Sequence, residues 1–186
     1  MFAASAKYPE GFRYQTDIVA PADEEQLLAN IRTLPFREFE FHGFTGKRRV
    51  VSFGWKYDFS ERELQKVDDI PAFLLEVREL AARFADLEAR DLQHVLVTEY
   101  DAGAGIGWHR DKAVFGDVIG ISLLASCTFR LRRKIGTKWE RVSLVAEPRS
   151  AYLLRGESRT IWEHSIPEVE TLRYSITFRN LSESQR

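Results

Sequence analysis

The stretch Arg173-Tyr-Ser-Ile-Thr-Phe-Arg179 has the alternation of a β-strand with two different faces. Successive side chains of a strand point to opposite sides, so the two arginines share one face with Ser175 and Thr177, and the apolar residues share the other. Arginine side chains on one face of a buried strand need anionic partners to balance their charge. A guanidinium binds a carboxylate through two hydrogen bonds where lysine offers a point charge, so this face favours a dicarboxylate. Because the arginines lie roughly 20 Å apart along an ideal strand, we do not expect them to hold the same carboxylate.

Upstream of this strand the sequence contains a set of metal-ligand residues. His109 and Asp111 are two positions apart, and such residues project from the same face of a strand, so both could bind one ion from a single strand end. His164 must come from elsewhere in the fold. Two imidazoles and one carboxylate can hold one face of an octahedral iron and leave the other face open, as in non-haem Fe(II) oxygenases. The alternative of three unrelated surface residues requires the ligands and both arginines to coincide.

Four segments carry a family resemblance. They are Tyr100, Gly107-Trp-His-Arg-Asp111, Gly156-Glu-Ser-Arg159 and the strand 173–179. Together they resemble the AlkB family of Fe(II)- and 2-oxoglutarate-dependent dioxygenases over about residues 92–180, with a weaker similarity at residues 48–57. The resemblance implies a double-stranded β-helix and an enzyme that uses Fe(II), 2-oxoglutarate and O2.

The resemblance also implies roles for individual residues. The three ligand residues named above would hold the iron. Arg173 and Tyr100 would hold the distal carboxylate of 2-oxoglutarate, with Arg179 nearer the metal. Thr98 and Ser175 stand where the family often has asparagine, and both keep a hydroxyl but lose an amide. We therefore expect 2-oxoglutarate to be bound with fewer hydrogen bonds, in a divergent branch of the family.

Two segments are candidates for contact with a substrate. Residues 48–57 are similar to the substrate-lid strands of AlkB homologues, and the expected lid residues are Arg49, Phe53, Trp55, Tyr57 and Trp108. Ordinary strand packing is an equal alternative for the aromatic residues at 53, 55 and 57. The basic run at 130–134 favours a solvated hairpin, and the alternative is phosphate contacts at Arg132, Arg133 and Lys134.

The order of the expected elements indicates a mainly β, α+β fold. Helices are predicted from an N-cap at Asp23 to Leu34, and from Pro71 to about Ala89. From Leu92 onward the pattern predicts strands at 92–100, 118–125, 127–134, 139–145, 150–155, 160–165 and 172–180. Many short strands after helices favour a jelly roll braced on one side by helices. The 186 residues suit one domain, with helices and lid in about 1–90 and the jelly-roll core in about 91–182.

Composition limits the cellular setting. The sequence lacks an apolar run of about 18 residues and the basic and apolar blocks of a signal peptide, so we expect a cytoplasmic monomer with no membrane contact. The single cysteine, Cys127, lies in an apolar run and is expected to be a buried thiol. His94 is expected to be a core histidine. The net charge of -1 argues mildly against tight non-specific binding to nucleic acid.

The expected function is oxidative dealkylation of an alkylated nucleic-acid base, as in DNA or RNA repair. A modified tRNA base, a protein or a small molecule is the alternative substrate. A nucleic-acid-binding module without activity is less favoured, because the complete ligand set would then serve no purpose. A zinc hydrolase could use the same three ligands, but the paired arginines would be left unexplained.

Overall fold

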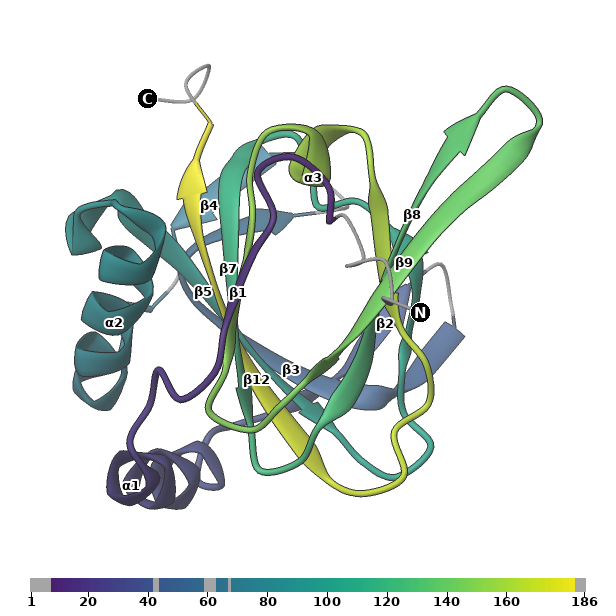
Figure 1. Cartoon of the computed structure of the whole chain (residues 1–186). Helices are drawn as coiled ribbons and strands as arrows, with labels where there is room; N and C mark the ends of the chain where they lie inside the picture. Colours follow the sequence, from purple (N-terminus) through teal and green to yellow (C-terminus); the bar gives the residue numbers. More distant parts are fainter. Residues whose placement is uncertain (1–7, 42–43, 59–62, 67, 183–186) are drawn as a thin grey trace.

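Two antiparallel β-sheets face each other in the computed structural model, which describes residues 8–41, 44–58, 63–66 and 68–182 (Figure 1). The major sheet has the order β1 (Arg13–Gln15), β10 (Ala151–Leu154), β7 (Phe115–Leu123), β12 (Arg173–Leu181), β5 (Leu92–Tyr100), β3 (Phe44–Asp58) and β2 (Arg37–Phe41), and β4 (Glu63–Lys66) pairs with β3. The minor sheet has the order β6 (Ile106–His109), β11 (Glu163–Ile166), β8 (Cys127–Ile135) and β9 (Lys138–Ala146). This arrangement confirms the predicted mainly β jelly roll.

Two helices, α1 (Pro21–Ile31) and α2 (Leu75–Ala85), cover the outer face of the major sheet (Figure 1). The predicted N-cap at Asp23 is wrong: Ala20 is the N-cap, because proline suits the first helical position and Asp23 lies in the first turn. The helix also ends before Leu34, since the residue preceding Pro35 is disfavoured in helical geometry.

The second helix is likewise shorter than predicted. It follows a 3-10 turn, η1 (Ala72–Leu74), and ends because Asp86 adopts the left-handed conformation with φ 54°. A second 3-10 turn, η2 (Ala89–Asp91), leads into β5. No described helix is long and apolar enough to cross a membrane.

Apolar side chains form two cores on either side of the major sheet. The first lies between the sheet and the helices and contains Val95, Val97, Ile176 and Phe178 from β5 and β12, with Leu74 and Val77 below them. Phe73, Leu80 and Phe84, from η1 and α2, are partly buried and pack against this core. The second lies between the two sheets and contains Cys127, Phe129, Leu131, Tyr152 and Trp162. Cys127 is thus the buried thiol that the sequence predicts.

The segment before β11 differs from its prediction. A strand was expected at 160–165, but Thr160 is the last residue of a short helix, α3 (Glu157–Thr160), and the strand begins only at Glu163, after a turn. Gly156, at φ 56°, turns the chain from β10 into this helix. Strands β8 and β9 form a long hairpin that extends beyond the body of the molecule on the side away from the helices (Figure 1).

Candidate metal and 2-oxoglutarate site

The three predicted metal ligands come together in the interior between the sheets. His109 ends β6 and lies directly opposite His164 on the neighbouring strand β11, with ring centroids 4.2 Å apart. Asp111 follows β6, and its Oδ2 is 3.5 Å from His164 Nε2. One ligand atom from each of the three residues lies within 4.8 Å of the others. Backbone pairing of two strands therefore brings together the two histidines, which are far apart in the sequence.

The carboxylate of Asp111 has one occupied oxygen and one oxygen without a partner. Arg179 on β12 donates to Oδ1 from Nε at 2.7 Å and from Nη2 at 2.5 Å. Oδ2 is buried without a hydrogen bond among the described residues, which is costly unless a cation binds there. Burial tends to raise the pKa of Asp111, but Arg179 and then His164 together hold this pKa below its ordinary value. The carboxylate is therefore ionised and suited to a metal ion.

The two histidines are neutral and can offer nitrogen lone pairs. Burial, followed by the nearby His109, lowers the pKa of His164 from its ordinary 6.5 to about 3, and burial also lowers the pKa of His109. The His109 Nδ1 is 2.8 Å from the carbonyl oxygen of Gly107. Because a carbonyl can only accept, Nδ1 carries the proton and Nε2 is left for a metal, as in many metal-bound histidines.

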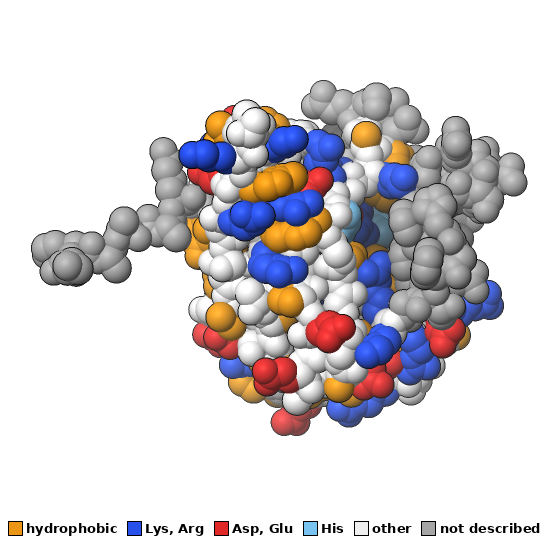
Figure 2. Space-filling view, turned by 90° about the vertical axis from the view of Figure 1, so that its right-hand side faces the viewer, with side chains coloured by type: hydrophobic (Ala, Val, Ile, Leu, Met, Phe, Trp, Pro, Cys, Tyr) orange, Lys and Arg blue, Asp and Glu red, His pale blue; other side chains and the backbone are white. Residues whose placement is uncertain are grey.

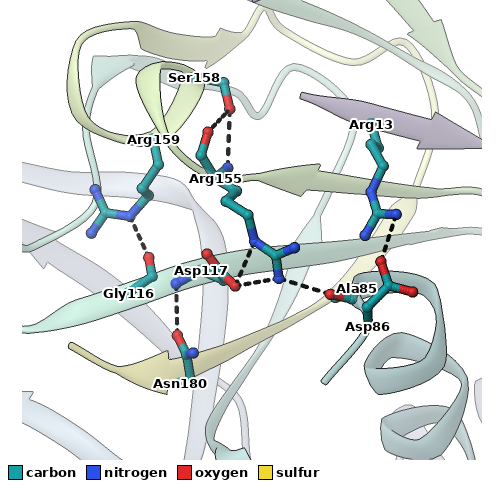
Figure 3. A network of polar contacts seen from close by, with 9 residues as sticks. All are labelled: Arg13, Ala85, Asp86, Gly116, Asp117, Arg155, Ser158, Arg159 and Asn180. Carbon is teal, nitrogen blue, oxygen red and sulfur yellow. Dashed lines mark hydrogen bonds and ion pairs between the residues drawn. The ribbon is translucent and has the colours of Figure 1, made fainter. Parts of the chain in front are cut away.

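Arg159 fixes the loop that carries Asp111. Its guanidinium donates to four backbone carbonyls, those of Asp111 at 3.2 Å, Lys112 at 2.7 Å, Phe115 at 2.8 Å and Gly116 at 2.8 Å. The contact with Gly116 is visible in Figure 3. Arg159 stands in the sequence as part of a family motif, but its structural role depends on tertiary contacts that residue spacing cannot predict.

A second arginine links this region to the helices. Arg155 donates twice to Asp117 Oδ2, at 2.9 and 2.6 Å, and once to the carbonyl of Ala85 at the end of α2, at 2.7 Å (Figure 3). The backbone N–H of Asp117 in turn donates to Asn180 Oδ1 at 2.6 Å. These contacts tie β7 and β12 to the end of β10 and to α2.

The pairing of β12 with β5 builds a candidate site for a carboxylate. Arg173 lies opposite Tyr100, and its Cζ is 5.0 Å from the centre of that ring. Its Nε and Nη2 contact Ser122 Oγ at 3.2 and 3.0 Å, and the side chain is almost fully buried. Nη1 is buried without a hydrogen-bond partner among the described residues. A buried guanidinium with an unsatisfied nitrogen fits a carboxylate ligand, as expected for the distal end of 2-oxoglutarate.

A cavity adjoins the ligand cluster between the sheets. Its walls include the three ligand residues together with Arg48, Leu96, Thr98, Tyr100, Phe129, Tyr152, Thr177 and Arg179. Ser175 lies opposite Thr98 on the same face of the sheet. His94, at the end of this row, is buried, and its Nδ1 is 3.3 Å from Arg179 Nη1, which confirms a core histidine. Contacts of Thr98 and Ser175 with 2-oxoglutarate stay predictions.

Tyr152 lines the cavity although the sequence did not predict it as a site residue. It lies opposite Gly120 in the pairing of β10 with β7, and a Cβ at Gly120 would collide with the Tyr152 ring. Burial, followed by Tyr100, raises the pKa of Tyr152, so its phenol keeps its proton and can donate a hydrogen bond into the cavity. The apolar sequence of β10 carries no signal for this role.

The predicted lid needs correction. Phe53 is 7% exposed and packs in the core beneath the helices. Arg49 also faces away from the cavity, because its guanidinium pairs with Glu99 at 2.6 Å, whereas the neighbouring Arg48 lines the cavity. Neither Phe53 nor Arg49 is therefore a lid residue. Trp55 is half-buried in the part of β3 that pairs with β4, and the side chain of Tyr57 lies outside the described residues.

Trp108 and the predicted phosphate contacts lie on the minor sheet rather than over the cavity. The ring of Trp108 contacts the guanidinium groups of Arg130 and Arg132. Arg132 pairs with Glu163 at 2.6 Å, because the two residues are opposite each other on β8 and β11. Arg133 pairs with Glu140 at 2.6 Å and with Glu157 at 3.2 Å. Two of the three predicted phosphate contacts thus already have carboxylate partners, while Lys134 is exposed.

Comparison with known proteins identifies the class. The profile of the 2OG-Fe(II) oxygenase superfamily matches residues 12–179, and the chain belongs to that superfamily. Asp111 Oδ2 and Arg173 Nη1, which have no hydrogen-bond partner in the described part of the chain, are suited to bind Fe(II) and 2-oxoglutarate respectively.

Within the superfamily the chain is AlkB-like. It is 28% identical over 175 residues to an Arabidopsis thaliana protein named alkylated DNA repair protein ALKBH8 homolog, covering 81% of this chain and 49% of the relative. It is 24% identical over 180 residues to the mouse tRNA (carboxymethyluridine(34)-5-O)-methyltransferase ALKBH8, covering 92% of this chain and 26% of the relative. The chain therefore spans about half and about a quarter of these proteins. The solved structure of OsALKBH1 superposes with a TM-score of 0.67 at 17% identity, over 94% of this chain and 99% of that one.

Proposed function

We propose that this 2OG-Fe(II) oxygenase oxidises an alkyl carbon on a base of a nucleic acid. The proposal rests on the positively charged side chains in and next to the catalytic cavity. Arg48 lines the cavity itself, and Lys47 and Arg130 line a groove that adjoins it. Cations at the entrance suit a substrate whose backbone is anionic. The names of the relatives, which refer to DNA repair and to a tRNA nucleoside, support the same substrate class.

The chain contributes positioning to this reaction. His109, Asp111 and His164 would hold the iron, and Arg179 fixes the orientation of the Asp111 carboxylate. Arg173 and Tyr100 would hold the distal carboxylate of 2-oxoglutarate. The bound iron, 2-oxoglutarate and O2 would supply the oxidation, in which one oxygen atom enters a substrate C–H bond and the other enters succinate, with release of CO2.

The fate of the product depends on the oxidised carbon. If the carbon is an N-methyl group, its hydroxylation gives a hemiaminal that breaks down to formaldehyde and the unmodified base. If the carbon is bonded to another carbon, the hydroxylated base is the product. Apolar walls such as Leu96, Phe129 and Ile166 would keep water from the reacting carbon in either case.

Turnover tests the proposal directly. Succinate and formaldehyde release should be measured with methylated single-stranded DNA, duplex DNA, tRNA and methylated peptides. His109→Ala and Asp111→Ala should each reduce succinate release by at least ~100-fold, because each removes a ligand from the metal. Asp69→Ala, which removes an exposed carboxylate, is the matched control and should retain activity. Stimulation of succinate release by a peptide and by none of the nucleic acids would refute the proposed substrate class.

A further inference from the structure

Four side chains stack on the outer face of the minor sheet. The guanidinium of Arg132 lies between two rings, 4.0 Å from the centre of Trp139 and 4.4 Å from the centre of Trp108. Arg130 contacts Trp108 at 4.9 Å. We call this series, Trp139, Arg132, Trp108 and Arg130, the Trp–Arg stack. Figure 2 looks at this side of the molecule, where basic and hydrophobic side chains alternate down the face.

The stack holds its arginine side chains in place and leaves the charge of Arg130 without a carboxylate partner in the described residues. Arg132 has two ring contacts and an ion pair with Glu163, so it serves as the fixed centre of the stack. Arg130 is held by Trp108 and by a hydrogen bond to Ser165 Oγ at 3.0 Å, and neither contact neutralises it. Stacking of a guanidinium on an indole limits its motion, so an anion binding there loses less entropy.

The outward positions of the minor sheet carry an excess of cations. In the pairing of β8 with β9, Arg132 lies opposite Arg141 and Lys134 lies opposite Trp139. With Arg130, the outward positions of β8, β9 and β11 hold four cations against the single carboxylate of Glu163, a difference of three. The whole chain has a net charge of -1, so positive charge is concentrated on this face.

A groove adjoins both Arg130 of the stack and the catalytic cavity. It has a volume of about 390 Å³ and is lined by Arg130, Lys47, Glu168 and the glycine-containing turn 103–107. Ile106 and Ile166 line both the groove and the cavity. In Figure 2, histidine side chains are visible in a hollow at the edge of this face. A bound strand could thus lie on the stack while one of its bases enters the cavity.

We propose that the Trp–Arg stack and the flanking Lys134 and Arg141 bind the single-stranded nucleic acid next to the oxidised base. This inference rests on the proposed function and adds a docking surface outside the catalytic cavity. Arg130, Lys134 and Arg141 bind phosphates, and a neighbouring base stacks on Trp139, which is 37% exposed. Aromatic rings between cations are the combination that holds single strands without reading their sequence. An acidic peptide would satisfy the charges and leave the rings unused.

Binding of an unmodified labelled RNA strand of about 15 nucleotides tests this surface, with fluorescence anisotropy measured over a range of salt concentrations. The double variant Lys134→Ala/Arg141→Ala should weaken binding about tenfold at low salt. It should also reduce the slope of log K against log salt by about 1.4, because each phosphate contact to a single strand contributes about 0.7. The matched control is Arg83→Ala/Arg90→Ala, which removes two exposed cations on the helical side and should bind as wild type.

The aromatic part of the surface has its own variants. Trp139→Ala should weaken binding about tenfold with little change in the salt slope, since stacking is not ionic, and Trp139→Phe should restore most of the affinity. Binding by the surface variants equal to that of the control pair would overturn the inference. Loss of affinity for an acidic peptide, with RNA binding unchanged, would also overturn it and indicate a protein partner.

The inference and the proposed function can fail separately. Succinate release without substrate should be unchanged in all surface variants, because none of them touches the metal site. If RNA binding depends on the stack but no nucleic acid is oxidised, the docking surface is supported and the proposed substrate class is refuted. If nucleic acids are oxidised while the surface variants bind them normally, only the docking surface is refuted.

Discussion

Arg173 is a buried cation, and only some of its hydrogen-bond donors have partners among the described residues. Its Nε and Nη2 contact Ser122, and its Nη1 has no partner among the described residues. Arg173→Lys keeps the charge and loses the planar fork, so we expect the KM for 2-oxoglutarate to rise about 10- to 100-fold. Steady-state succinate release at varied 2-oxoglutarate checks this, with the exposed Arg90→Lys as control. An unchanged KM would mean that another cation holds the distal carboxylate.

Single residues also show what the sequence could and could not predict. The grouping of His109, Asp111 and His164 was predictable because only a few residue types bind iron and their order is restrictive. The choice between Arg48 and Arg49 was not predictable. Arg48 shares a strand face with Val50, and Arg49 shares the other face with Val51. Each face of β3 thus carries one arginine and one valine, so the sequence does not show which face points inward.

The close contact between strands β7 and β10 requires a glycine at position 120. Gly120 lies opposite Tyr152, whose ring fills the space that a Cβ would need. Gly120→Ala should lower the free energy of unfolding by about 1–3 kcal/mol through overpacking, and the displaced ring should weaken 2-oxoglutarate binding. Urea denaturation and titration with 2-oxoglutarate measure the two effects.

Two further variants distinguish this explanation from a general loss of glycine. Gly107→Ala is the control, because a Cβ there would meet no atom within 4 Å. Tyr152→Leu in the Gly120→Ala background should recover stability by making room. If the control costs as much stability as Gly120→Ala, the collision with Tyr152 is not the cause.

Elements were predictable where one pattern dominates. Strands β8 and β12 alternate in sequence, and β5, β8, β9 and β12 were all predicted close to their observed bounds. The segment 157–166 was misread because a single helical turn and a four-residue strand are both too short to show a period. Strands β1 and β2 were missed since they are short and largely polar. The partner of β1 is the distant strand β10, whereas β2 pairs with the next strand, β3.

Buried neutral histidines link the stability of the whole molecule to pH. Burial, and then Arg179, lowers the pKa of His94 well below 6.5, and burial lowers the pKa of His164 to about 3. The unfolded chain binds protons near pH 6.5 and the folded chain does not, so the free energy of unfolding should fall as the pH drops below about 6.5. Each such histidine contributes a slope of about 1.4 kcal/mol per pH unit.

Urea denaturation of chelator-treated protein at pH 7, 6 and 5 measures this slope. His94→Gln should make the slope shallower by the contribution of one proton, whatever its effect on stability at pH 7. Parallel slopes for the variant and the wild type would show that His94 is not held neutral in the folded state.

The β8–β9 hairpin ends in a turn at Gly136 and Thr137 that projects away from both cores. A Cβ at Gly136 would meet no atom within 4 Å, and Thr137 is exposed. The chain has one cysteine, Cys127, and burial both hides its thiol and raises its pKa. A cysteine placed at Thr137 would consequently react first with a maleimide dye. An optical reporter can therefore be attached to the hairpin that carries the Trp–Arg stack while the native Cys127 stays in place in the core.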